Sequence, residues 1–180
     1  MINKSQVTVN VTLHQTSNAS WNGVSLNMFK SSAACRNTCE IAMIFDHELG
    51  HGYDANDGAP NARPGEAYAD NTASIHHHDA CIGRGFFTGA GTCGGYGDPC
   101  IVCTGVRGSD WLDHVSKRPH TILMLQAAGP MVCPGGGDIC GFETHCAAYP
   151  ITEAVWDATS IGLPHNAIPA NGGAACAGTS

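Results

Sequence analysis

The sequence predicts a single α+β domain, residues 1–180, in which a small β-sheet and two central helices are joined by many loops and stapled by disulfide bonds. Residues 7–13 alternate apolar and polar side chains, as a half-buried strand does. Residues 39–51 and 65–78 have the composition and spacing of helices. Ten cysteines and 23 glycines accompany only 13% charged residues, which favours cross-links over long amphipathic helices.

Charge and hydropathy argue against nucleic-acid binding and against a membrane-spanning segment. The net charge of -7 and the pI near 5.7 argue against nucleic acid, whose phosphates need basic patches. No apolar run is long enough to span a membrane. The chain is long enough for one compact core, and no repeat or linker divides it. The sequence leaves the oligomeric state open.

The elements follow in order along the chain. Residues 18–31 predict a turn at Asn22-Gly23 followed by a second strand. The two predicted helices are separated by a Gly-, Pro-, Asn- and Asp-rich loop at 54–65. The remaining segments are predicted as an irregular Gly- and Cys-rich stretch at 81–110, a short helix at 119–128, a later helix at 149–160 and a coil from Pro164.

An even number of cysteines in a loop-rich chain predicts disulfide bonds in an oxidising compartment. The ten are Cys35, Cys39, Cys81, Cys93, Cys100, Cys103, Cys133, Cys140, Cys146 and Cys176. The C-x-x-C spacing of Cys100 and Cys103 allows a rival structural zinc site, but such a site needs another cysteine pair, and Cys133 and Cys140 are too far apart in sequence to match. We therefore expect a secreted or extracellular protein. No export signal is visible, so the expected disulfides fit either a trimmed chain or a fragment of a longer precursor.

His47-Glu48-Leu49-Gly50-His51 carries the strongest chemical signal. It reads H-E-x-x-H within a segment with a helical apolar body. Residues four apart share a helix face, so His47 and His51 can bind one zinc ion. Glu48 lies beside that ion and can accept a proton from a polarised water.

Two histidines leave a catalytic zinc one protein ligand short. Glu66 is the leading candidate, because Asp70 lies four residues on and can accept the N–H of a ligand histidine. Asp57 ranks second, and the His76-His77-His78 run and the His114/His120 pair follow. A solvated helix face is the alternative for Glu66 and Asp70.

Two other clusters have simpler interpretations. Three successive histidines point in three directions on a helix, so His76–His78 cannot all bind one ion and fit the C-terminal end of a helix. Asp54, Asn56 and Asp57 could hold Ca²⁺ through oxygens, but their spacing is not that of an EF-hand. A solvated turn is the favoured interpretation of that segment.

With these motifs the chain resembles gluzincin-type zinc metallopeptidases, as a divergent relative of the thermolysin and fungalysin families. Three segments carry the likeness: Asn18–Gly23, the zinc-binding stretch His47–Gly52, and Gly65–Asp70 with the glutamate ligand and its aspartate support. Residues 145–157 resemble a late segment near the substrate cleft more faintly. The loop between His51 and Glu66 is shorter than is usual there, and residues 81–140 have no counterpart.

The resemblance implies a zincin-like fold, a protein or peptide substrate and peptide-bond hydrolysis. His47, His51 and Glu66 would hold zinc, Glu48 would be the general base, and Asp70 would support a ligand. His145 is the expected donor to the oxyanion, with Tyr68, Tyr149 and His120 behind it. Two rival functions stay open: a non-catalytic, disulfide-rich zinc-binding or adhesion module, and a zinc hydrolase acting on a non-peptide substrate.

Overall fold

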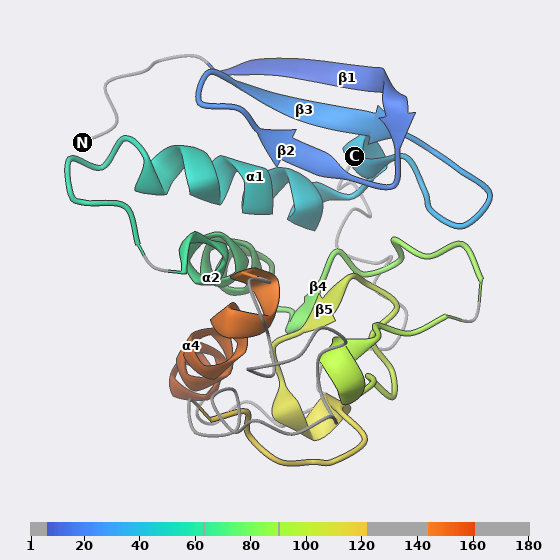
Figure 1. Ribbon diagram of the computed structural model, residues 1–180, viewed down its shortest axis with the longest axis vertical. Helices are drawn as coiled ribbons and strands as arrows, with labels where there is room; N and C mark the ends of the chain where they lie inside the picture. Colours follow the sequence, from blue (N-terminus) through green and yellow to red (C-terminus); the bar gives the residue numbers. More distant parts are fainter. Residues whose placement is uncertain (1–6, 63, 90, 122–143, 161–180) are drawn as a thin grey trace, which may run out of the picture.

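The computed structural model describes residues 7–62, 64–89, 91–121 and 144–160. It has the mixed α/β composition that the sequence predicts, with small sheets, helices and disulfide bonds. Helix α1 (Ala42–Asp54) lies between a three-stranded sheet and helix α2 (Gly65–His77), and α2 in turn packs against helix α4 (Thr144–Thr159) (Figure 1). No helix in the described ranges is long and apolar enough to cross a membrane.

The three-stranded sheet has the order β1-β3-β2. Strand β1 (Thr8–Thr16) runs parallel to β3 (Ser25–Lys30), and β2 (Ala19–Trp21) pairs with β3 in the antiparallel sense. The predicted turn between β2 and β3 forms: Gly23 has φ of +90°, and the Asn22 side-chain oxygen accepts hydrogen bonds from the amides of Val24 and Ser25. Central strand β3 supplies two fully buried apolar side chains, Leu26 and Met28.

Strand β1 departs from its predicted pattern. Its register against β3 shifts between Asn10 and Leu13, and again between Leu13 and Thr16. Such shifts interrupt the two-residue alternation of faces. Val11 is consequently 53% exposed, although its position in the pattern predicts burial.

Helices α1 and α2 approach closely through a small residue. A short 3-10 helix, η1 (Thr38–Glu40), precedes α1, and extended backbone at Ile41 separates the two, so the continuous helix begins at Ala42 rather than at 39. Gly50 of α1 sits directly over Ala69 of α2. The close crossing brings the polar face of each helix against the other.

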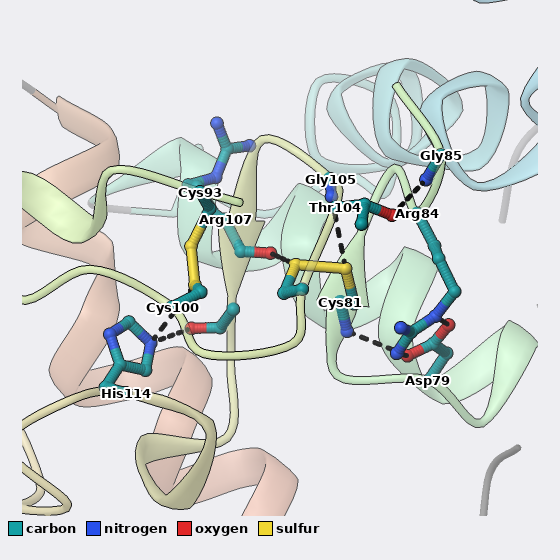
Figure 2. The surroundings of a disulfide bond; sticks show 12 residues. Asp79, Cys81, Arg84, Gly85, Cys93, Cys100, Thr104, Gly105, Arg107 and His114 are labelled. Carbon is teal, nitrogen blue, oxygen red and sulfur yellow. Dashed lines mark hydrogen bonds and ion pairs between the residues drawn. A yellow bond between two sulfur atoms is a disulfide. The ribbon is translucent and has the colours of Figure 1, made fainter. Parts of the chain in front are cut away.

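A disulfide-bonded layer follows α2. Strand β4 (Cys81–Ile82) pairs with β5 (Arg107–Gly108). The bond Cys81–Cys103 ties the intervening loop to β4, and Cys93–Cys100 closes a shorter loop within it (Figure 2). This layer also contains two further 3-10 helices, η2 (Gly95–Gly97) and η3 (Trp111–Asp113). Arg107 lies in β5 between the two disulfides, which fixes its backbone position (Figure 2).

The predicted disulfides are confirmed for the described cysteines 81, 93, 100, 103 and 146. The C-x-x-C pair is thus divided between two disulfides and is not the zinc site of the rival interpretation. Within the described ranges Cys35 and Cys39 are unpaired. Cys133, Cys140 and Cys176 lie outside the described residues.

The later helix is longer than predicted. Helix α4 begins at Thr144 rather than at 149, and Pro150 lies inside it. Residues 119–121 are not helical, and the rest of the short helix predicted at 119–128 lies outside the described residues, as does the coil from Pro164.

Candidate metal centre

The H-E-x-x-H residues lie on the face of α1 that meets α2. His47 and Glu48 are both buried at 6% exposure, and His51 is half-buried one turn later. The ligating atoms of the three side chains lie within 4.8 Å of one another. The helical spacing predicts this grouping, because i and i+4 positions share a face.

Glu66 of α2 meets both histidines. Its Oε2 atom lies 3.2 Å from His47 Nε2 and 3.5 Å from His51 Nε2. A third imidazole approaches the same oxygen from α4, with His145 Nε2 at 3.0 Å. Four potential ligands from three helices therefore converge on one point.

The contacts of the three imidazoles with Glu66 Oε2 do not have the geometry of hydrogen bonds. Glu66 Oε2 is buried, and none of the three short contacts is aligned as a hydrogen bond. A buried carboxylate oxygen without an aligned donor costs free energy unless another group satisfies it. A cation held by the same oxygen and nitrogens would satisfy it, so the donor set fits a zinc ion.

Asp70 supports the centre from one turn further along α2. Its Oδ1 lies 2.8 Å from His47 Nδ1, although that nitrogen is not aligned with the oxygen as in a straight hydrogen bond. Arg107 donates to the same carboxylate from Nε, at 2.9 Å, and from Nη2, at 2.7 Å. A planar guanidinium matches the two carboxylate oxygens in this way. Asp70 is thus fixed between an arginine and a candidate ligand.

Burial and charge act together on these groups. Burial alone would lower the pKa of His47, but the carboxylates of Asp70 and Glu66 outweigh it and raise that pKa to about 9. Burial opposes ionisation of Glu66, yet His145, His47 and His51 hold its pKa well below the usual range. For Asp70, Arg107 and His47 overcome burial and also lower the pKa. Both shifts favour the ionised carboxylates, whose negative charge would balance a bound cation.

A cavity of about 300 Å³ opens beside the centre. Glu48, His47, His145 and Arg107 form part of its wall. The rest of the wall combines the polar residues Ser17, Asn18 and Thr38 with apolar side chains from the sheet side, α1 and the disulfide layer: Ala19, Ile44, Ile82, Phe86, Phe87, Tyr96 and Val106. The arrangement places an acidic side chain and a candidate metal site at the edge of a hollow with both polar and apolar walls.

The other sequence candidates lie elsewhere. The Asp57 side chain accepts a hydrogen bond from the Ala59 amide in an exposed turn. Burial and the carboxylates of Asp57 and Asp54 raise the pKa of Tyr68, which places this tyrosine near the same loop. None of these groups joins the convergence at Glu66.

His114, His120 and Tyr149 form a separate buried cluster. The His120 ring stacks on Tyr149 at 4.8 Å, and His120 Nδ1 lies 2.6 Å from Glu153 Oε1. Both nitrogens of His114 face backbone carbonyl oxygens, at 2.6 and 3.0 Å. These side chains are not among those that line the cavity.

Sequence reasoning missed two residues of the site. Arg107 lies 37 positions from Asp70 in a segment predicted as irregular, and only the β4–β5 pairing brings it to α2. Tyr96 lines the cavity from η2 with a positive φ of 53°. The sequence singles out Arg107 only in that it is a cationic residue in a segment with few charged residues.

Comparisons of the chain with protein-family models, with curated proteins and with solved structures found no match. The gluzincin resemblance stays a prediction from the motifs.

Proposed function

We propose that this chain is a zinc-dependent peptidase, most closely an endopeptidase of the gluzincin type with a zincin-like fold. One observation carries the proposal: three imidazole nitrogens approach a buried, unsatisfied carboxylate oxygen of Glu66 next to Glu48 and the cavity. His47, His51 and Glu66 would hold the ion. When bound, zinc supplies Lewis acidity and lowers the pKa of a water towards about 7.

Glu48 would act as the general base. It is buried beside His47 on the same helix turn, and its side chain reaches the cavity wall. A carboxylate there can accept a proton as water attacks the peptide carbonyl, then return it to the leaving amine. His51 lies one turn on and is not among the residues that line the cavity.

Asp70 and Arg107 would position the first ligand. The Asp70 carboxylate lies against His47 Nδ1, so it would orient the ring and leave Nε2 as the nitrogen that could hold the ion. Arg107 holds Asp70 through two charged hydrogen bonds. The disulfide layer would therefore help to hold His47 in place, because it carries Arg107, which binds Asp70.

His145 would stabilise the transition state. Its Nε2 lies against Glu66, its side chain is 34% exposed, and it lines the cavity together with His47 and Glu48 of α1. An imidazole at that position can donate to the oxyanion that forms on the peptide carbonyl. The apolar side chains of the cavity wall would accept substrate side chains, beside its polar residues. The disulfides fit a secreted or extracellular setting.

Two other functions are weaker. Glu48 is a buried acid at the edge of the cavity, and a non-catalytic zinc-binding or adhesion module does not require such a residue. A hydrolase acting on a non-peptide substrate uses the same chemistry, so the substrate decides between them.

The test uses the purified chain with casein as the substrate. We expect cleavage that a chelator abolishes and added zinc restores, with an Asp57→Asn variant as an active control. Absence of casein cleavage by zinc-loaded protein would contradict the peptidase proposal. Hydrolysis of small esters without peptide cleavage would favour the non-peptide hydrolase.

A further inference from the structure

A second group of metal-binding side chains lies on the outer side of the α1–α2 pair. Asp46 precedes His47 on α1, and His76 and His77 end α2. Asp46 Oδ2 lies 2.6 Å from His76 Nδ1 and 2.7 Å from His77 Nε2. The proposed peptidase centre uses none of the three.

Neighbouring helical residues usually point in different directions, yet these two imidazoles reach one oxygen. They do so because His76 presents Nδ1, close to its backbone, and His77 presents the more distant Nε2. Their rings are tilted by 50° with centroids 5.2 Å apart, so stacking does not explain the arrangement. Two nitrogens and one carboxylate oxygen thus form a compact triangle.

Asp46 is buried at 8% exposure, and in the described part of the chain these two imidazoles are its hydrogen-bond partners. The outer edge of the group is open: the His76 side chain is 71% exposed and that of His77 is 26% exposed. An ion can enter from solvent, and waters can complete its coordination. Imidazole with carboxylate is a ligand set that suits zinc, copper, nickel and cobalt.

We propose that Asp46, His76 and His77 form a second site for a divalent transition-metal ion. Zinc bonds of about 2.0–2.1 Å in a tetrahedral site require ligand atoms about 3.3 Å apart. The present separations must widen by several tenths of an ångström, which the exposed His76 side chain allows. A bound ion would link α1 to the C-terminal end of α2. These two helices carry His47, His51 and Glu66, so the outer ion would also stabilise the scaffold of the inner site.

The test is a calorimetric titration of chelator-stripped protein, free of any histidine tag, with zinc chloride alone. Wild type should bind two ions. His76→Gln should lose one, and so should His51→Gln, which keeps the outer site. His78→Asn is the matched control, because His78 is the exposed neighbour in the left-handed region that asparagine tolerates, and it should keep both.

The variants separate this proposal from the proposed function. A single ion in wild type that is lost in His51→Gln and retained in His76→Gln would overturn the second site and leave the inner centre intact. A single ion that is lost only in His76→Gln would support the outer site and count against the inner one. Zinc should also raise the melting temperature of His51→Gln more than that of a His51→Gln/His76→Gln double variant. Equal shifts would contradict the link between the helices.

Discussion

Gly50 of α1 sits so close to Ala69 of α2 that a methyl group added at Gly50 would lie 2.8 Å from the Ala69 Cα atom. The obstacle is backbone and cannot rotate away. This contact sets the separation of the helices that carry His47, His51 and Glu66. The geometry of the candidate zinc centre therefore depends on Gly50, which is not itself a candidate ligand.

Gly50→Ala should destabilise the protein by about 1–3 kcal/mol, because the added methyl forces the helices apart. Gly52→Ala is the matched control: its methyl would meet the Trp21 ring at an ordinary 3.6 Å. The control should be neutral or gain up to about 1 kcal/mol from helix propensity. Chemical denaturation measures both, and equal stabilities would contradict the close packing.

Glu66→Ala should lower zinc affinity by more than about 10–100-fold, which is the loss typical when a residue that only supports a metal ligand is removed. Asp57→Ala should leave the affinity unchanged, since that side chain only caps an exposed turn. Competition with a zinc-binding dye measures both. If zinc is lost with Asp57 and retained without Glu66, the assigned ligand set is wrong.

Arg107→Lys should weaken zinc binding by about 10–100-fold, because Asp70 would lose its bidentate partner and hold His47 less firmly. Arg84→Lys is the control. It breaks an equivalent two-point pair with Asp79, at 2.6 and 2.7 Å, outside the site. Both variants should lose stability, at about 1.5–3 kcal/mol for each charged hydrogen bond removed. Equal zinc affinity in the two would exclude a positioning role for Arg107.

The sequence predicted the part of the site that depends on local spacing. His47 and His51, and likewise Glu66 and Asp70, are four residues apart on helices, so periodicity alone places each pair on one face. Arg107 depends instead on strand pairing and on disulfide connectivity, which spacing does not encode. The register shifts in β1 likewise arise from its pairing with β3, and the local sequence pattern does not predict them.

His145→Ala should reduce kcat by about 10²–10³-fold while zinc content is retained, as for the loss of an oxyanion donor. His145 is the most exposed member of the convergence at Glu66, which fits contact with substrate. Steady-state kinetics on a peptide, with metal content measured on the same sample, separates the roles. Loss of zinc would make His145 a ligand, and an unchanged kcat would remove it from the reaction.

Glu48→Gln tests the central claim most directly. The amide keeps the shape of the side chain and loses its basicity, so zinc should stay bound while kcat falls by about 10²–10⁴-fold. The measurement is the turnover of a peptide substrate by wild type and variant, with zinc content determined on both preparations. A zinc-replete Glu48→Gln protein that cleaves the peptide at the wild-type rate would contradict the account.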